Sequence, residues 1–246
     1  MFSTILKNSL KAVLKQKGYQ ICKISTLESD IKEGKYAWLQ DMGIRTVLDV
    51  GANVGKFTTM ISEILSNVNI YAFEPLADCY KELIENTKHL DNINYFNFAL
   101  GEKQAETTIY HNEFSPSSSI LKMKELHKNI FPQTINVFNE IVQIKDLDCF
   151  NDEIKWIQKT LMKIDVQGFE LNVLKGAISS LNKVDVIIVE ISFVELYENQ
   201  PRFEDIYSFL IKSNFSYYGN FDQLKDPKSG SILQADAIFL KTKSNR

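Results

Sequence analysis

From residue 45 onward, hydrophobic and polar positions form short apolar runs that alternate with longer amphipathic stretches. The run Val184–Glu190 is nearly continuous in its apolar residues, as is typical of a strand buried on both faces of a parallel sheet. The alternation predicts a doubly wound, mostly parallel α/β domain with helices on both faces. The expected strands are 46–50, 69–73, 93–98, 106–110, 140–145, 160–165, 184–190, 215–218 and 235–241, and the expected helices are about 54–66, 76–89, 168–181 and 203–213.

Two regions depart from this rhythm. Residues 1–44 predict an N-terminal helical extension with helices at 2–17 and 28–42. The first is basic and amphipathic, so it can lie on a membrane surface, but packing against its own domain or a partner subunit is favoured. Residues 112–139 hold two prolines and a serine run, and they predict an insertion or lid within a domain at 45–246.

Composition narrows the classes of function. The chain has 246 residues, of which 44% are hydrophobic, enough for the core of one large α/β domain. A net charge of −3 without a basic block argues against a nucleic-acid partner. The cysteines Cys22, Cys79 and Cys149 form no C-x-x-C pair, so neither a disulfide framework nor a zinc site is expected. Free thiols fit a cytoplasmic protein, and no apolar run approaches the roughly 18 residues of a transmembrane helix.

The first strand, turn and helix of the domain indicate a nucleotide-derived cofactor. The strand ends with Asp49, and the turn that follows contains Gly51, Asn53 and Gly55. Glycines let a ligand approach the backbone because no Cβ blocks it. The next strand ends in Glu74, and an acid about 20 residues past such glycines binds ribose hydroxyls in nucleotide folds.

The chemistry of this turn favours S-adenosylmethionine over a dinucleotide. The dinucleotide fingerprint G-x-G-x-x-G brings backbone amides to a pyrophosphate, whereas this turn is one glycine short. Asp49 would repel a diphosphate and suits a ligand that carries an ammonium and a sulfonium. An NAD(P)-dependent oxidoreductase and a non-catalytic Rossmann-like binding module remain alternatives. In the simplest structural interpretation, Asp49 caps the following helix and Gly51 only turns the chain.

Acidic residues also follow the later strands. Asp165, Glu170 and Glu190 are expected to face one cleft at the carboxyl ends of the sheet. Asp165, or a water that it orients, is expected to take the proton of an alcohol acceptor. Alternatively, Asp165 caps the next helix and Glu170 lies in its first turn. Asp165 and Glu190 are also a candidate pair of Mg²⁺ ligands, although two acids are a thin basis for a metal site.

Six short segments, spread over about residues 45–240, occur in an order that is specific as a combination. They are Leu48–Thr58, Phe73–Pro75, Asn97–Gly101, Ser117–Ile120, Lys163–Glu170 and Gln234–Phe239. In this order they resemble FkbM-type methyltransferases. The resemblance implies a class I, Rossmann-like enzyme that uses S-adenosylmethionine, usually on the oxygen of a sugar or natural-product hydroxyl. It also implies a seven-stranded sheet whose last strand runs antiparallel.

Carried onto this chain, the resemblance implies a role for each matching residue. Asp165 would lie near the transferred methyl group and the acceptor. Gln167 departs from the family pattern, because many relatives carry glutamate there, and glutamine cannot act as a base. The implied contacts to the methionine part are Asp49, Gly51, Asn53 and Gly55, the contact to the ribose is Glu74, and the residues beside the adenine are Asn97 and Ala99.

The remaining expectations concern the acceptor. A small-molecule or glycan hydroxyl is expected to enter under residues 112–139. A nucleic-acid methyltransferase is disfavoured, because enzymes acting on base amines often carry an Asn/Asp-Pro-Pro-aromatic element where this chain has Asp165–Gly168. His111 precedes the insertion without a visible partner and is expected to be an ordinary surface residue.

Overall fold

The computed structural model describes Gly34, Tyr36 and residues 38–112, 115–131, 134 and 137–242. The chain divides into two units, Met1–Trp38 and Leu39–Arg246. The predicted helix at 2–17 and the first part of the one at 28–42 lie outside the described residues.

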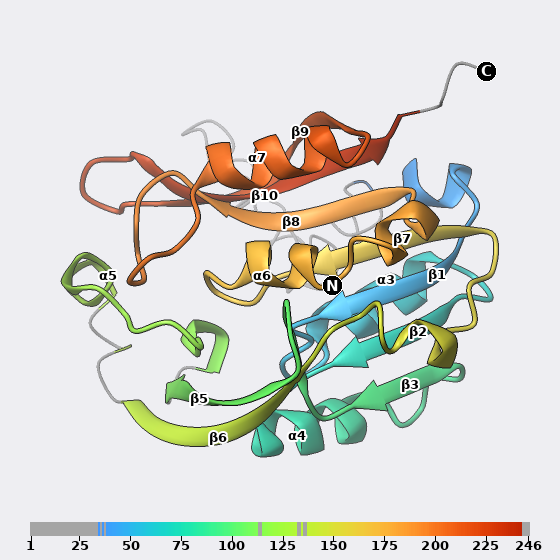
Figure 1. Cartoon of the computed structure of the whole chain (residues 1–246), viewed down its shortest axis with the longest axis horizontal. Coiled ribbons are helices and arrows are strands. Elements are labelled where there is room, and N and C mark those ends of the chain that lie inside the picture. The colour runs from blue at the N-terminus through green and yellow to red at the C-terminus, as the bar shows by residue number, and fades with distance from the viewer. Residues whose placement is uncertain are drawn as a thin grey trace, which may run out of the picture. The chain divides into compact units, whose positions relative to one another are not determined.

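A seven-stranded sheet forms the centre of the second unit (Figure 1). In spatial order its strands are β3 (Ile93–Phe96), β2 (Asn69–Phe73), β1 (Ile44–Val50), β7 (Lys159–Ile164), β8 (Val186–Ser192), β10 (Ile232–Lys241) and β9 (Phe215–Lys225). All neighbours pair in parallel except β10, which is antiparallel to both β8 and β9. The expected mostly parallel sheet with an antiparallel last strand is therefore confirmed.

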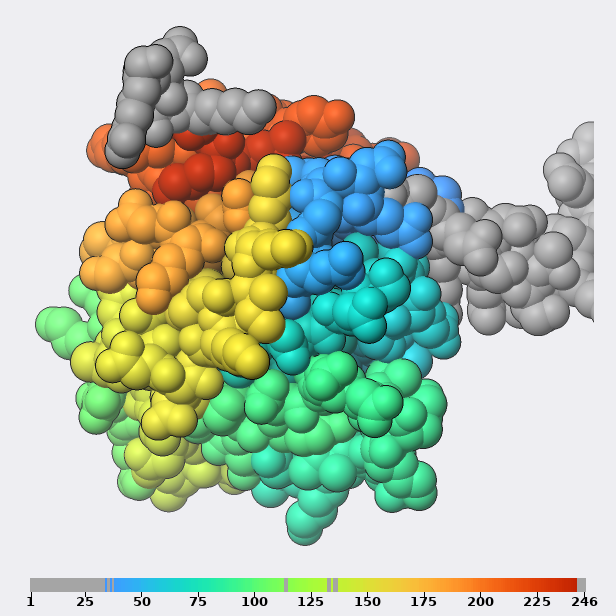
Figure 2. All heavy atoms as spheres, turned by 90° about the vertical axis from the view of Figure 1, so that its right-hand side faces the viewer, coloured from blue at the N-terminus to red at the C-terminus, as the bar shows by residue number. Residues whose placement is uncertain are grey.

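The strand order brings distant segments together. Figure 2 looks onto the edge where the parallel strands begin, and there the blue residues of β1 lie beside the yellow residues that precede and form β7. The pairing register sets Asp49 directly beside Lys163. Because the carboxyl ends of parallel strands share one edge, β1, β2 and β7 all deliver the residues that follow them to the same place.

Helices pack on both faces of the sheet. They are α3 (Lys56–Ile64), α4 (Ala77–Thr87), α6 (Glu170–Lys175) and α7 (Phe203–Lys212), with 3-10 turns at η3 (Asn151–Glu153) and η4 (Ser180–Lys183). Successive strand side chains point to opposite faces. Phe73 belongs to the main core with Val173 of α6 and Leu210 of α7, whereas its neighbour Ala72 packs with Leu83 of α4. This alternation explains why the central strands are apolar throughout.

A second, three-stranded sheet lies toward the end to which the parallel strands point (Figure 1). It consists of β4 (Ala99–Leu100), β6 (Val137–Lys145) and β5 (Ala105–Asn112), with β6 in the middle. The expected insertion joins β5 to β6, and its described part contains η1 (Ser115–Ser117) and α5 (Glu125–Ile130). A bridge between Tyr110 and Ser119 ties this segment back onto β5.

Two of the predicted elements differ most in length from the sequence prediction. The helix expected at 168–181 ends at Lys175, because the chain at Gly176 runs against Gly101; a Cβ on Gly176 would lie 1.9 Å from the Gly101 carbonyl oxygen. The strand expected at 215–218 extends to Lys225, because it pairs along the length of β10. An edge strand needs no apolar pattern to do so, and its polar residues therefore gave no strand signal.

No helix in the described residues is long and apolar enough to cross a membrane.

The contact between Gly176 and Gly101 yields a prediction about stability. Gly176→Ala should lower the free energy of unfolding by about 1–3 kcal/mol, because two backbone segments must separate to admit the methyl group. Urea denaturation measures this change. Ser179→Ala, an exposed position in the same connection, is the matched control and should change the value by less than about 0.5 kcal/mol. Equal effects of the two substitutions would contradict the close contact.

Candidate active site

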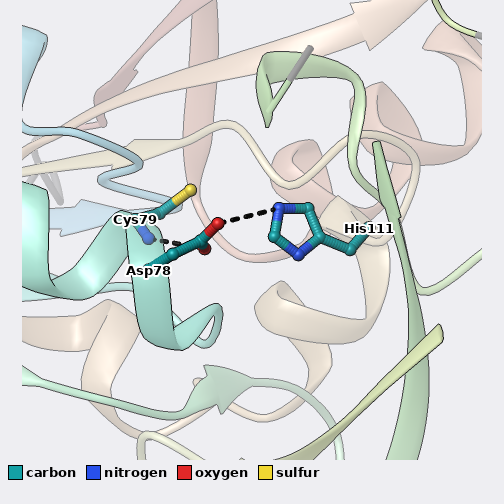
Figure 3. Close-up of side chains that lie close together, drawn as sticks. All are labelled: Asp78, Cys79 and His111. Carbon is teal, nitrogen blue, oxygen red and sulfur yellow. Dashed lines mark hydrogen bonds and ion pairs between the residues drawn. The ribbon is translucent and has the colours of Figure 1, made fainter. Parts of the chain in front are cut away.

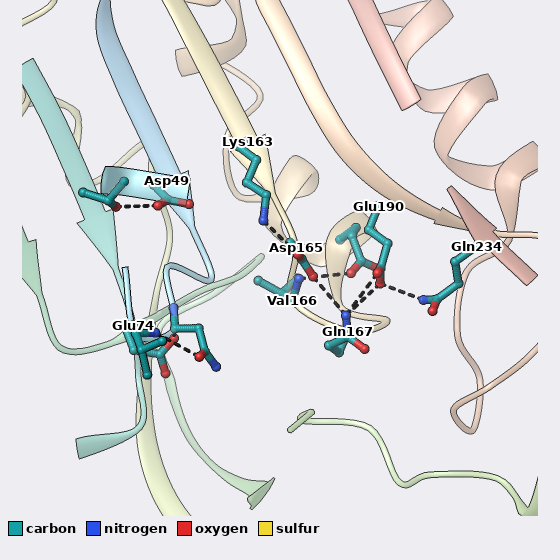
Figure 4. Close-up of polar contacts among 12 residues, drawn as sticks. Asp49, Glu74, Lys163, Asp165, Val166, Gln167, Glu190 and Gln234 are labelled. Atoms are coloured by element: carbon teal, nitrogen blue, oxygen red, sulfur yellow. Dashed lines mark hydrogen bonds and ion pairs between the residues drawn. The ribbon is translucent and has the colours of Figure 1, made fainter. Parts of the chain in front are cut away.

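A cavity of about 360 Å³ lies beyond the carboxyl ends of β1, β2 and β7. In open α/β sheets this edge is where ligands bind. Figure 4 shows Glu74 on one side of this region and Asp165 with Glu190 on the other. Of the residues predicted for the site, six line the cavity, namely Gly51, Asn53, Glu74, Ala99, Asp165 and Glu190, and four do not, namely Asp49, Gly55, Asn97 and Glu170.

The turn after β1 requires glycine at position 51. Gly51 has a φ of 81°, in the left-handed region that side chains disfavour. A Cβ there would lie 2.0 Å from the carbonyl oxygen of Asp165. The amides of Gly51 and Ala52 both donate to the carbonyl of Phe73 at 3.0 Å, and the amide of Asp165 donates to the carbonyl of Val50 at 3.0 Å. These contacts fix the ends of three strands against one another.

Asp49 lies beneath this turn, behind the cavity wall. It is fully buried, and its Oδ2 accepts a hydrogen bond of 2.6 Å from Thr58 Oγ1. Its Oδ1 has no hydrogen-bond partner among the described residues. Burial raises the pKa of Asp49, and the attraction of Lys163 offsets only part of this effect. Asp49 thus acts on the cavity through its charge and through α3, which Thr58 anchors.

Glu74 joins the end of β2 to the turn. Its Oε2 accepts from the amide of Asn53 at 2.8 Å, and its Oε1 accepts from the amide of Leu76 at 2.9 Å. Burial raises the pKa of Glu74 to about 7, although both amide hydrogen bonds act in the opposite direction. The residue lines the cavity, and each carboxylate oxygen has a further lone pair to offer to a ligand hydroxyl.

Two other predicted cofactor contacts, Asn97 and Gly55, do not line the cavity but hold elements next to it. Asn97 is exposed, and its Nδ2 donates to the carbonyls of Glu74 and Pro75 at 2.9 and 3.0 Å, so it holds the loop that carries Glu74. Gly55 precedes α3 and packs on α4, where a Cβ would lie 2.8 Å from Leu83 Cδ1. Of the pair predicted beside the adenine, only Ala99 reaches the cavity.

A chain of hydrogen bonds crosses the other side of the cavity (Figure 4). Asp165 Oδ2 is 2.8 Å from Lys163 Nζ, and its Oδ1 accepts from Gln167 Nε2 at 2.9 Å. The same amide group donates to both oxygens of Glu190, at 3.1 and 3.0 Å, and Gln234 Nε2 donates to Glu190 Oε2 at 2.7 Å. One glutamine amide therefore bridges the two carboxylates.

The two carboxylates differ in acidity because their neighbours differ. Burial raises the pKa of Asp165, but the Lys163 ammonium outweighs it and holds the pKa below its usual value. Burial raises the pKa of Glu190 well above 4.5, and the nearby charges of Asp165 and Glu170 raise it further. Asp165 is thus the permanent anion of the pair, and Glu190 is the stronger base.

Gln167 has a strained backbone conformation as well as a central position. Its φ of 52° lies in the left-handed region, which non-glycine residues occupy mainly at turns and functional sites. Its Oε1 accepts a hydrogen bond of 2.9 Å from the Tyr197 hydroxyl, and its carbonyl accepts one of 2.6 Å from Ser119 Oγ of the insertion. The insertion and the β8–α7 connection thus both fix the bridging amide.

Glu170 serves the loop that follows β7. Its Oε1 accepts from the amides of Gly168 at 2.9 Å and Val166 at 3.2 Å, and the side chain is buried outside the cavity. Burial raises the pKa of Glu170 to about 7. Glu170 lies in the first turn of α6, as the structural alternative expected. Asp165 does not cap this helix, because its carboxylate contacts Lys163 and Gln167 instead.

The insertion separates the main cavity from a smaller one of about 160 Å³, which Tyr110 and Tyr197 help to line. From Ser117 to Leu121, successive residues of the insertion line the two cavities in alternation. Ser118 and Ile120 line the main cavity, and Ser117, Ser119 and Leu121 line the smaller one.

The prediction of a surface position for His111 is wrong. Only 3% of His111 is exposed, and its two ring nitrogens face Asp78 and Glu140. The error arose because both partners are distant in sequence and come from other elements, α4 and β6. None of His111, Asp78 and Glu140 lines the main cavity.

The sequence analysis also missed four residues of the polar chain. Lys163 and Gln167 lie within a recognised segment, but pattern alone assigned neither a partner. Gln234 also lies in a recognised segment, on the antiparallel strand β10, and pairs with Ser192 of β8. Tyr197 lies in an irregular connection, where no periodicity predicts the direction of a side chain. The feature that could have pointed to these residues is their place in the sequence, close to the carboxyl ends of the predicted parallel strands or in the strand paired with them.

Comparison with known proteins identifies relatives. The chain is 27% identical over 146 residues to hexuronic acid methyltransferase AglP of Haloferax volcanii, a match that covers 58% of this chain and 54% of the relative. It is also 27% identical over 162 residues to 2-O-methyltransferase NoeI of Sinorhizobium fredii, covering 63% of this chain and 66% of that protein. The matches thus span about half to two thirds of these relatives.

A solved structure and a family model agree with these relatives. The crystal structure of methyltransferase FkbM from Methylobacillus flagellatus KT superposes with a TM-score of 0.50 at 12% identity, covering 80% of this chain and 43% of that one, which shows a shared fold. The sequence model of the methyltransferase FkbM domain matches residues 49–218, which include the glycine turn, Glu74 and the bridged carboxylates. The chain belongs to the FkbM methyltransferase family.

Proposed function

We propose that this protein transfers the methyl group of S-adenosylmethionine to a hydroxyl oxygen of a sugar, a glycan or another small natural product. One observation carries the proposal: a single cavity presents the buried acid Glu74, at the end of β2, on one side and the bridged pair Asp165 and Glu190 on the other. The first arrangement suits a nucleoside, and the second suits the removal of a proton from an alcohol.

The residues present fit S-adenosylmethionine. Glu74 would accept hydrogen bonds from the ribose hydroxyls, and the turn at Gly51 would admit the methionine part close to the backbone. Apolar side chains of the cavity, among them Phe98 and Leu100, suit the adenine ring. The carboxylates in the lining disfavour a pyrophosphate, which argues against the NAD(P) alternative.

When bound, the cofactor supplies a methyl group already activated by the positive charge on sulfur. The work of the chain is to align the acceptor, to exclude water and to accept one proton. We propose that Glu190 accepts the proton of the acceptor hydroxyl, because its raised pKa makes it a better proton acceptor than Asp165. Lys163 lowers the pKa of Asp165 and so makes it a weaker base. Asp165 then fixes Lys163 and Gln167 and keeps the site negative beside a cationic cofactor.

The same geometry disfavours the Mg²⁺ alternative between the two carboxylates. The amide nitrogen of Gln167 donates to both Asp165 and Glu190, so hydrogen-bond donors occupy the place between them that a cation would take. An amide nitrogen does not ligate Mg²⁺, which binds oxygen. We therefore propose a reaction that needs no divalent ion at this point.

The relatives support a hydroxyl acceptor. One is named as a methyltransferase of hexuronic acid and the other as a 2-O-methyltransferase. A direct test incubates the full chain and labelled S-adenosylmethionine with a panel of sugars, lipid-linked glycans and small alcohols. Transfer of label to an acceptor oxygen supports the proposal. If S-adenosylhomocysteine fails to raise the thermal midpoint while NAD(P) raises it, the oxidoreductase alternative replaces it.

The assignment of the base predicts a difference between two substitutions. Glu190→Gln should lower kcat roughly 10²- to 10⁴-fold with little change in cofactor affinity, because the proton acceptor is lost. Asp165→Asn should cost less. The kcat/KM of the wild type should rise with pH through a value well above 4.5, because Glu190 must be ionised to act. Glu198→Gln, an exposed acid, is the control. A profile that is flat above pH 4.5, or a larger loss in Asp165→Asn, contradicts the assignment.

The role of Glu74 predicts a loss of cofactor binding. Glu74→Ala should weaken the binding of S-adenosylhomocysteine roughly 10²-fold, because about two charge-assisted hydrogen bonds disappear. Titration calorimetry measures this directly. Glu82→Ala, an exposed acid on α4, should leave the affinity unchanged. Wild-type affinity in the Glu74 variant would remove this residue from the site.

The buried position of Glu170 predicts a pH-dependent effect on stability. Its pKa is about 7 in the folded protein against 4.5 ordinarily, so its stabilising contribution is present below pH 4.5 and is lost as the pH rises through 7. Glu170→Gln keeps the acceptor oxygen and removes the charge. It should raise the free energy of unfolding at pH 8 by up to about 3 kcal/mol, and by almost nothing at pH 4.5.

Urea denaturation at the two pH values tests this prediction, and turnover of the same variant is measured alongside. Glu170 is a positioning residue if turnover is preserved. A loss of turnover as large as that of Glu190→Gln would make Glu170 a catalytic residue instead.

A further inference from the structure

A second cluster of metal-ligating side chains lies outside the main cavity (Figure 3). Asp78 and Cys79 lie in the first turn of α4, and His111 comes from the end of β5. One donor atom from each residue lies within 4.8 Å of the other two. Cys79 and His111 are buried, whereas the side chain of Asp78 is 62% exposed. None of the three lines the cofactor cavity.

The hydrogen bonds of His111 determine what its second nitrogen can do. Nδ1 is 3.2 Å from Glu140 Oε2, and the other oxygen of Glu140 accepts from the amide of Ala77 at 3.0 Å. A histidine whose one nitrogen donates to a carboxylate presents a lone pair on the other, and this is the usual arrangement behind metal-ligating histidines. Here that other nitrogen, Nε2, is 3.4 Å from Asp78 Oδ2.

A lone pair that faces a carboxylate needs a cation between them. Either a proton or a metal ion can fill this place. The buried sulfur of Cys79, which also hydrogen-bonds with the side chains of Ser115 and Asp78, adds a third donor within 4.8 Å of the other two. The three donors together offer one nitrogen, one oxygen and one sulfur, the mixture that zinc accepts and that Mg²⁺ or Ca²⁺ does not.

We propose that Asp78, Cys79 and His111 bind a zinc ion, with Glu140 orienting the histidine and water in the fourth position. Binding moves the thiol proton of Cys79 to solvent and forms a thiolate–metal bond. Donor atoms around tetrahedral zinc lie about 3.5 Å apart, so the three donors must close by at most about 1.3 Å. The exposed side chain of Asp78 has room for this movement.

The position of the site indicates a structural role. The thiol of Cys79 also hydrogen-bonds with the side chain of Ser115, whose Oγ donates to Asn53 Oδ1 at 3.2 Å. Ser115 is the first described residue of the insertion after β5 and lines the cofactor cavity. A metal at this point would link α4 to β5 and would hold the start of the insertion over the turn after β1.

Cobalt provides the test, because Co²⁺ replaces Zn²⁺ in such sites and a thiolate ligand gives it an intense near-ultraviolet charge-transfer band. The experiment uses the full chain with Cys22→Ser and Cys149→Ser, which leaves Cys79 as the only cysteine. After chelation and dialysis, the protein is titrated with Co²⁺ and then with Zn²⁺. We expect the band to saturate at one Co²⁺ per chain and to disappear when Zn²⁺ is added.

Single substitutions in this background separate the ligands from their support. Adding Cys79→Ser should abolish the charge-transfer band, and Asp78→Asn should weaken Co²⁺ binding. Glu140→Gln should keep the band but lower the affinity about 10- to 100-fold, as expected for a residue that only orients a ligand. Zn²⁺ should raise the Tm of the parent and not that of the Cys79→Ser variant. Circular dichroism confirms that each variant is folded.

Two outcomes overturn the proposal. One is the absence of a charge-transfer band in the parent at saturating Co²⁺, and the other is a band that persists after Cys79→Ser. Either would leave Asp78, Cys79 and His111 as a hydrogen-bonded cluster that binds no metal. Neither outcome tests methyl transfer itself, because none of Asp78, Cys79 and His111 lines the main cavity.

Discussion

The site depends on one buried cation. The side chain of Lys163 is only 12% exposed, yet it lies beside Asp49 in the sheet register and makes an ion pair of 2.8 Å with Asp165. Burial by itself would lower the pKa of Lys163, but the two aspartates together raise it. Buried charges persist only when they are paired, so this ammonium is what allows carboxylates to gather at the apolar edge of the sheet.

The remaining polar groups give each acid a distinct character. Asp165 has a cation and an amide as neighbours and stays ionised. Among the described residues, the hydrogen-bond donors to Glu190 are the amides of Gln167 and Gln234, and burial together with the nearby acids raises its pKa. Carboxylates a few ångströms apart can take different roles when their environments move their pKa values apart. In this chain, the amide of Gln167 bridges the pair.

Much of the fold was predictable because its signals are local. Apolar runs located the five central parallel strands, and Gly51 with Glu74 located the cofactor side of the cavity. The length of β9 was not predictable, because its outer half is polar and is defined by its pairing with β10. The early end of α6 was not predictable either, because it depends on Gly101, which is distant in the chain.

For the site, residue types were easier to foresee than contacts. The sequence indicated that Asp165 and Glu190 would meet at one edge, and both line the cavity. It gave no means of seeing that Lys163 would weaken one as a base, or that the amide of Gln167 would join them. It misplaced His111 because a buried histidine and an exposed one look alike when their partners lie on other strands and helices.

The alternation from Ser117 to Leu121 constrains how this family member can diverge. Each residue of the segment faces one cavity and each of its neighbours faces the other, so exchanges of side chains can reshape either compartment independently. A single inserted or deleted residue would instead reverse every later side chain at once, as a register slip does in a strand. Drift in this stretch should therefore proceed by replacement at constant length, even though it lies in an irregular connection, where length usually varies most.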